Sequence, residues 1–197
     1  MEKLKEIGTG IASAFTSSFL EMPKYEVDQK QADFEERSYS ESVWASTEVK
    51  SMKYSDATTK GFWRLFGYIS GENELKKKIP MTAPVTVKVL PGPGPNCEST
   101  FVVSFYVGKE YQDEPPKPTN PDVFIQKWTP KKMFVRQFGG FASEADWVEH
   151  ARTLGDKVPS DAKFVKDYYF TAGYDAPMKI FNRKNEVWFI KEEAESG

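Results

Sequence analysis

The stretch VTVKVLPGPGPNCESTFVVSFYV, residues 85–107, decides the fold class because it contains two strand patterns and the turn between them. Apolar residues alternate with other residues in VTVKVL (85–90) and again in TFVVSFYV (100–107), which is the period of a strand covered on one face. The Pro- and Gly-rich run between them is typical of a hairpin connection. We therefore expect an antiparallel pair of strands here.

Further strand-like runs extend in both directions from this hairpin. One precedes it and four follow it, at 43–49, 122–128, 132–138, 164–174 and 185–191. With the two strands of the hairpin these make seven such runs, and we expect eight or nine strands in the whole chain.

Two segments instead have helical spacing. The first starts near Ser55 and Asp56, which suit an N-cap, and has a stop signal at Gly71. The second starts at Ser143, with Asp146 three residues further on as in a capping box. Two strands precede and two follow each helix, so the chain reads as two similar strand-strand-helix-strand-strand halves. The predicted fold class is α+β, a distorted antiparallel β-barrel of eight or nine strands with two flanking helices.

Composition narrows the function classes. The chain has 197 residues, enough for one large domain, and 15% of them are aromatic. A net charge of -2, from 27 basic and 29 acidic residues, gives no field that would attract nucleic acid. One cysteine, Cys97, excludes an intrachain disulfide and suits a reducing compartment, and no apolar run reaches the roughly 18 residues of a transmembrane helix. We expect a cytosolic protein.

The N-terminal residues 1–22 form a separate arm in this interpretation. Ile7, Ile11, Phe15 and Phe19 recur every four residues, which predicts a narrow apolar stripe that packs on the body or frays in solvent. A membrane-surface helix is the alternative, disfavoured because the polar face carries hydroxyl groups in place of Lys or Arg.

The first helix has an apolar flank beyond the face that seats it on the sheet. Trp63 and Phe66 extend this flank from Phe62, with Lys60 and Arg64 just beyond it. An apolar shelf bordered by cations suits a flat ligand with acidic edges. The alternative is that Trp63 covers a loop or the N-terminal arm.

Catalytic motifs are weak in this sequence. His150 is the single histidine, it has no nucleophile motif around it, and Cys97 lies in a polar loop. One His and one Cys cannot supply a His- or thiolate-rich zinc site. We therefore expect no enzyme activity and no metal site.

Four motifs occur in an order that resembles the SOUL / heme-binding protein family, in particular its heme-binding-protein-2-like (SOUL) branch. They are KIPMTAPV (78–85), FVRQFGGFAS (134–143), YYFTAGYDAPMK (168–179) and NRKNEVW (182–188). The resemblance covers residues 24–191 and implies a distorted barrel of two similar halves that binds heme or another tetrapyrrole reversibly. It divides the chain into the arm (1–22), a SOUL heme-binding domain (23–192) and a C-terminal tail (193–197).

The resemblance also implies a ligand site, a shallow groove between the first helix and the loop after AGYDAPMK. Its residues would be Thr59, Phe62, Trp63, Phe66, Gly67, Met178, Lys179, Phe181 and Arg183. Ile180 shares the loop, and Lys179 with Arg183 would pair with the heme propionates.

The sequence departs from the family pattern at three positions. Thr59 and Gly67 stand where other members carry basic helix residues, and Ser38 stands where some carry a histidine proposed as iron ligand. We therefore expect non-covalent heme without a strong axial ligand, because His150 is more often a packed helix residue than a ligand.

The functional expectation is a carrier or buffer of heme or porphyrin. The alternative is a protein-protein interaction module of the same fold, acting in mitochondrial or cell-death signalling, and a third option is the binding of other flat hydrophobic molecules. The expected location is the cytoplasm, with a possible association with mitochondria.

Overall fold

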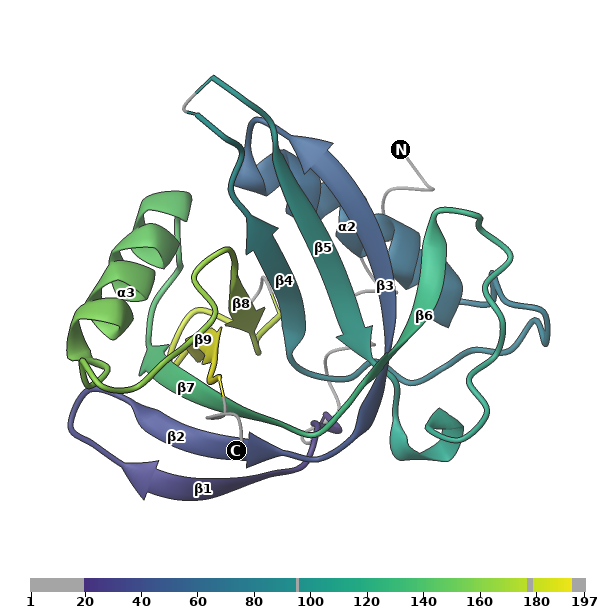
Figure 1. The fold of residues 1–197 in the computed structure, drawn as a ribbon. Coiled ribbons are helices and arrows are strands. Elements are labelled where there is room, and N and C mark those ends of the chain that lie inside the picture. Colours follow the sequence, from purple (N-terminus) through teal and green to yellow (C-terminus); the bar gives the residue numbers. More distant parts are fainter. Residues whose placement is uncertain (1–19, 95, 177–178, 193–197) are drawn as a thin grey trace.

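The computed structural model describes residues 20–94, 96–176 and 179–192. Within these ranges the chain forms nine strands, two α-helices and one short 3-10 helix (Figure 1). In chain order these are β1 (Tyr25–Lys30), β2 (Glu35–Tyr39), β3 (Ser42–Ser51), α2 (Tyr54–Ile69), β4 (Val85–Leu90), β5 (Ser99–Tyr106), η1 (Lys109–Tyr111), β6 (Val123–Trp128), β7 (Lys131–Phe138), α3 (Glu144–Lys157), β8 (Tyr169–Gly173) and β9 (Asn185–Ile190).

All nine strands belong to one antiparallel sheet in the order β1-β2-β7-β9-β8-β4-β5-β3-β6. From β2 to β6 the order is symmetric about the contact between β4 and β8. Strands at equal distances from this contact correspond to each other: β4 to β8, β5 to β9, β3 to β7 and β2 to β6. The two halves are thus related by an approximate twofold axis between β4 and β8. The predicted α+β fold with two similar halves and two helices is confirmed.

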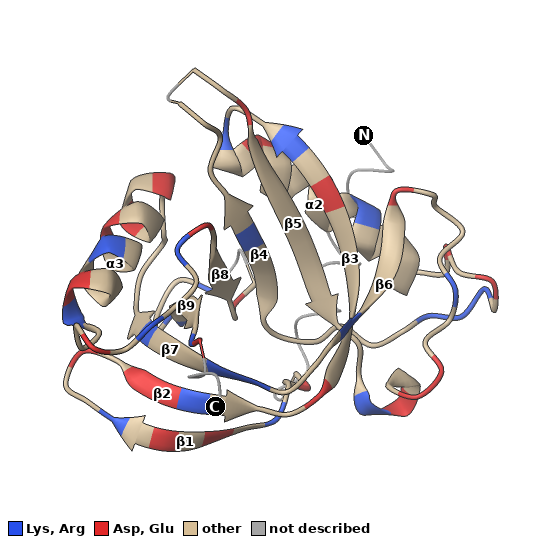
Figure 2. Cartoon of the chain, in the orientation of Figure 1, with Lys and Arg blue, Asp and Glu red and all other residues tan. Residues whose placement is uncertain are grey.

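The first half has an additional strand, β1, which pairs with β2 at the edge of the sheet. Three strands therefore precede α2, and the prediction of two was wrong. Neither β1 nor β2 shows the alternation that marks the other strands, because β1 is almost entirely exposed and β2 carries charges on both faces. Figure 2 shows these two strands with several charged bands, whereas β5 is uncharged.

The sheet curls strongly, and one face is concave. The ring of Trp128 on β6 lies 5.1 Å from the ring of Phe170 on β8, although three strands separate β6 from β8 in the sheet. This contact requires the sheet to bend around its interior. The interior is filled by a buried cluster that includes Tyr39, Trp44 and Trp188 and contains no helix residue.

The helices cover the other face. α2 lies on β3 and β5, and α3 lies on β7 and β9. α2 approaches β5 closely because Gly61 faces the fully buried Val103, where a Cβ on residue 61 would come within 2.4 Å of the valine side chain.

The two helix starts differ from each other. α3 has the predicted capping box, in which Ser143 and Asp146 accept each other's backbone N–H groups. α2 starts at Tyr54 after Lys53, which makes no side-chain cap, so the predicted cap at Ser55 and Asp56 was wrong. Its first turn is instead fixed by Tyr54, whose hydroxyl lies 2.7 Å from the hydroxyl of Thr171 on β8.

Part of the proposed N-terminal arm contacts the body. Leu20 packs against the buried apolar cluster between α2 and the sheet. Glu21 forms a β-bridge with Thr82, and its carboxylate accepts a hydrogen bond from the backbone N–H of Lys109. Residues 1–19, with the predicted stripe, and the tail from 193 lie outside the described residues. No helix in the described ranges is long and apolar enough to cross a membrane.

Two of the helix glycines, Gly61 and Gly155, provide a test of this packing. Gly61→Ala should lower the free energy of unfolding by about 1–3 kcal/mol, because the new methyl group overlaps Val103. Gly155→Ala in α3 is the matched control, since its Cβ would lie 3.6 Å from the Phe189 ring, and helix propensity should raise stability by up to about 1 kcal/mol. Urea unfolding measures both, and equal effects of the two variants would contradict the close approach of α2.

Candidate functional site

The exposed flank of α2 is an aromatic cluster of Phe62, Trp63 and Phe66. The three ring centroids are 5.7–5.8 Å apart, and the Phe62 ring lies 5.4 Å from Phe105 on β5. Phe62 and Phe66 are half-buried against the core, whereas Trp63 is 42% exposed. The cluster is therefore anchored on the sheet and presents a ring surface to solvent, as a flat ligand would need.

Of the two cations expected beside this cluster, Lys60 is exposed and forms no ion pair with a described residue, whereas Arg64 is engaged. Thr59 is exposed on α2, and Arg64 is paired with Asp122 at 2.6 Å. Gly67 is covered by the side chain of Glu72, since a Cβ at residue 67 would lie 2.6 Å from a carboxylate oxygen. A carboxylate thus lies where a basic side chain would have pointed, which disfavours acidic ligand groups at this end of α2.

The second predicted part of the site is the loop between β8 and β9. Ile180 and Phe181 are 67% and 79% exposed, so the apolar tip of the loop faces solvent. Met178 lies outside the described residues. The exposure of two large apolar side chains on one loop is the pattern of a contact surface.

The cations of this loop are engaged within it. Arg183 donates to the carbonyl oxygens of Ala176 and Lys179, both at 2.7 Å, and its guanidinium lies 4.4 Å from the ring centroid of Phe141. Lys179 forms an ion pair with Asp175, and its side chain is 45% exposed. Arg183 therefore shapes the loop, and Lys179 is the more accessible of the two cations.

The sheet brings the base of this loop onto the same face as α2. Phe105, on which Phe62 packs, is the register partner of Val85, and Val85 is the partner of Gly173, the last residue of β8. Two strand spacings of about 4.8 Å separate Phe105 from Gly173. Among the described residues, a Cβ at Gly173 would meet no atom within 4 Å, so they leave open space there. The register thus places the α2 cluster and the last residue of β8 on one face, and the position of the loop tip relative to the cluster stays a prediction.

A buried carboxylate that we did not anticipate holds both ends of the loop. Glu186 on β9 is fully buried and accepts from the Tyr174 hydroxyl at 2.7 Å, while the Lys184 ammonium lies 3.1 Å away. It also pairs with Arg37 at 3.1 Å and accepts from the Trp188 indole at 2.8 Å. Burial and this carboxylate raise the pKa of Tyr174 well above its usual value. The signal in the sequence is an acidic residue within the apolar strand NEVWFI.

Ser38, one of the positions at which the sequence departs from the family pattern, lies on a strand near the edge of the sheet, away from the α2 cluster. It is on β2, where its hydroxyl donates to Asp28 at 2.6 Å. Three strands, β7, β9 and β8, lie between β2 and β4. The structure therefore does not bring position 38 together with the α2 cluster.

His150 on α3 is packed and engaged. Its ring is stacked on Phe138 with centroids 3.7 Å apart, and its Nδ1 accepts from Arg136 at 3.2 Å. Burial and the nearby Arg136 charge lower the pKa of His150, so the ring is neutral at pH 7. No group of three or more His, Cys, Asp or Glu suitable for a metal ion occurs in the described part of the chain.

Comparison with known proteins gives matches over most of the chain. The family model for the SOUL heme-binding protein matches residues 20–190. The chain is 40% identical over 188 residues to heme-binding protein 2 of Homo sapiens, covering 93% of this chain and 92% of that protein. It is 37% identical to heme-binding protein 1 of Xenopus laevis, with coverage of 80% and 83%. The C-terminal domain of EcmrR, at 9% identity, superposes with a TM-score of 0.58 over 86% of this chain and 99% of that one, a likeness of fold alone.

The packing of His150 predicts a pH dependence. Its pKa in the folded state is below the ordinary value of about 6.5, so the unfolded state binds the proton more readily. This contribution to stability is complete above about pH 6.5 and is lost as the pH falls towards the folded-state pKa. An NMR titration of the single imidazole should have its midpoint below 6.5, and Arg136→Gln should move it upwards. A midpoint at or above the ordinary value would contradict the packed, neutral ring.

Proposed function

This chain belongs to the SOUL heme-binding protein family, and on that premise we propose that it binds heme or a related porphyrin reversibly and without catalysis. The observation that carries the proposal is the exposed aromatic cluster of α2, which lies on the same face as the base of the β8–β9 loop. The role is that of a soluble carrier or buffer for the tetrapyrrole.

Apolar contact supplies most of the binding free energy in this proposal. One ring face would lie on Trp63 and Phe66, where each Å² of apolar surface removed from water contributes roughly 25 cal/mol. Ile180 and Phe181 would contact the ligand from the loop. Lys179 would pair with a propionate at the rim, in exchange for Asp175.

The residues present are suited to apolar contact with a porphyrin ring, but they supply no strong ligand for its iron. His150 uses Nδ1 to bind Arg136 and stacks on Phe138, and Ser38 is on a distant strand. Heme would therefore be held non-covalently and without a strong protein ligand, so metal-free protoporphyrin should bind with similar affinity.

We also propose a cytoplasmic location, with mitochondrial association as the alternative. The single cysteine, Cys97, is free and exposed, which suits a reducing compartment.

A role as an interaction module in cell-death signalling has less support. The segment after α3 would have to supply a partner-binding helix. α3 instead ends at Lys157, and residues 158–168 form turns and a single bridge at Phe164. Pro159 and its turn to Ala162 suit this irregular path.

The aromatic cluster can be tested by titration. Trp63→Ala with Phe66→Ala should weaken both hemin and protoporphyrin at least about tenfold, since each truncation removes on the order of 1 kcal/mol or more of apolar contact. The Soret band and tryptophan fluorescence report binding. Phe124→Ala is the matched control, because Phe124 on β6 is also 42% exposed and should not affect either ligand.

Three outcomes distinguish the parts of the proposal. Absence of saturable binding at micromolar ligand would remove the function altogether. Binding that the double variant leaves unchanged would refute the α2 groove as its location. Equal binding of planar dyes that are not porphyrins would indicate a less selective site for flat molecules.

A further inference from the structure

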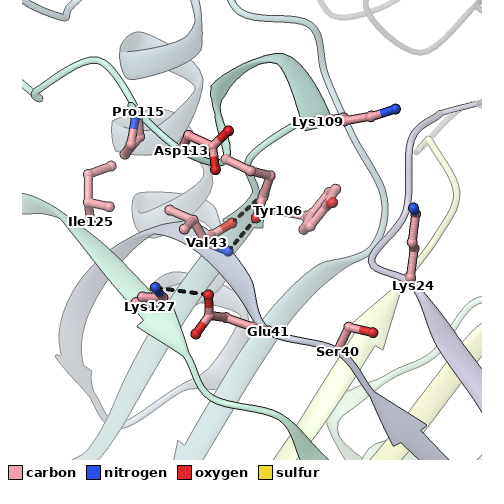
Figure 3. Close-up of a pocket in the computed structure, with 11 residues that line it drawn as sticks. Lys24, Ser40, Glu41, Val43, Tyr106, Lys109, Asp113, Pro115, Ile125 and Lys127 are labelled. Atoms are coloured by element: carbon pink, nitrogen blue, oxygen red, sulfur yellow. Dashed lines mark hydrogen bonds and ion pairs between the residues drawn. The ribbon is translucent and has the colours of Figure 1, made fainter.

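A cavity of about 490 Å³ lies apart from the predicted groove and contains none of its residues. It is formed where β3 begins, β5 ends and β6 passes, it is bounded on one side by the segment around η1, and it opens to solvent (Figure 3). Its volume is within the range of small-molecule sites. Its lining residues are Lys24, Ser40, Glu41, Val43, Tyr106, Lys109, Gln112, Asp113, Pro115, Ile125 and Lys127.

The wall of the cavity is fixed by the side chain of Gln112. Its Oε1 accepts the backbone N–H of Val43 at 2.8 Å, and its Nε2 donates to the carbonyl of Val43 at 3.2 Å and to that of Val107. These contacts attach the η1 segment to the start of β3 and satisfy backbone groups that would otherwise need water. The cavity is therefore preformed, and a ligand need not order it.

The two ends of the cavity differ in chemistry. At one end the side chains of Val43, Ile125 and Pro115 provide an apolar surface. The other end of the cavity contains Lys24, Lys109 and the ring of Tyr106 (Figure 3). An apolar body joined to one acidic group matches this division.

The charges favour an anion at the lysine end. Lys127 pairs with Glu41 at 2.8 Å, whereas neither Lys24 nor Lys109 forms an ion pair with any residue in the described ranges. Asp113, the other acid of the lining, is on the side of Pro115.

Glu21 is an acid beside the lysine end, outside the lining itself. It is engaged with the backbone N–H of Lys109 at 2.9 Å, and together with burial it raises the pKa of Tyr106. The Tyr106 hydroxyl therefore stays protonated at neutral pH and can donate to an anion.

We propose that this cavity is a second ligand site, which binds a small carboxylate with an aromatic or branched apolar body. The carboxylate lies between Lys24, Lys109 and the Tyr106 hydroxyl, and the apolar body lies over Val43 and Ile125. The site is independent of the tetrapyrrole groove and does not rest on that proposed function.

Two probes with the same phenyl body test the proposal. In ¹H–¹⁵N spectra of the full chain, 3-phenylpropionate should cause saturable shifts at the amides of Val43, Tyr106 and Gln112. Phenethylamine, with the opposite charge, should bind at least about tenfold more weakly. Shifts that are absent, scattered over the surface or equal for the two probes would overturn the proposal.

Reversing the charges of Lys24 and Lys109 tests where the carboxylate binds. Lys24→Glu with Lys109→Glu should weaken 3-phenylpropionate about threefold to tenfold, the range expected when exposed ion pairs are lost. Both lysines are exposed, so the fold should persist. The matched control is Lys50→Glu with Lys163→Glu, which reverses two exposed lysines outside the cavity and should leave binding unchanged. An equal effect of both pairs would refute a specific site.

Hemin titration of the same variants shows whether the carboxylate site and the tetrapyrrole groove are separate sites. The Lys24 and Lys109 reversal should leave hemin binding unchanged, and Trp63→Ala should leave 3-phenylpropionate binding unchanged. If the reversal weakens hemin and Trp63→Ala does not, the cavity is the tetrapyrrole site, and the inference of a separate carboxylate site is overturned.

Discussion

The pairing of β4 with β8 is the contact on which the rest of the structure depends. It joins two parts of the sheet, β1-β2-β7-β9-β8 and β4-β5-β3-β6, and runs from Val85 opposite Gly173 to Val89 opposite Tyr169. Without this pairing, β8 and β4 would each be an unpaired edge strand, and the two helices would cover two separate sheets. Because register partners point to the same face, the pairing also aligns Phe105 beneath α2 with Phe138 beneath α3 in one row through Gly173. The outer face, on which the groove is predicted, is continuous only because this register is kept.

The interior of the curled sheet and the ends of the β8–β9 loop are linked through Glu186. Burying a carboxylate is unfavourable unless it is paired and hydrogen-bonded. Here Arg37, Tyr174, Lys184 and Trp188 all contact it, so its charge and lone pairs are satisfied. Tyr174 and Lys184 are the two ends of the β8–β9 loop, so the geometry of the loop base follows from packing inside the sheet. The exposed tip at Ile180 and Phe181 is presented on a fixed base.

Aromatic side chains serve two different purposes in this protein. Trp44, Trp128 and Trp188 fill the concave interior, where Trp44 stacks on Trp128 at 4.6 Å. Trp63 on α2 and Phe181 in the β8–β9 loop are instead exposed to solvent. The aromatic content of the chain alone does not separate these roles, because period and spacing give the direction of a side chain but not what covers it.

The sequence alone determined the antiparallel sheet, the repeated halves, the capping box of α3 and the direction of the α2 aromatic flank, since these follow from local periodicity and cap chemistry. It did not identify β1 and β2 by pattern, because their charged residues pair and pack with distant strands. Tertiary structure alone decided that Arg183 holds its own loop, that Glu72 covers Gly67 and that Glu186 anchors the loop ends. It also formed the cavity lined by Lys24 and Lys109, whose residues come from segments far apart in the chain. Each of these depends on contacts between residues whose proximity is set by strand register and sheet curvature, which no local pattern records.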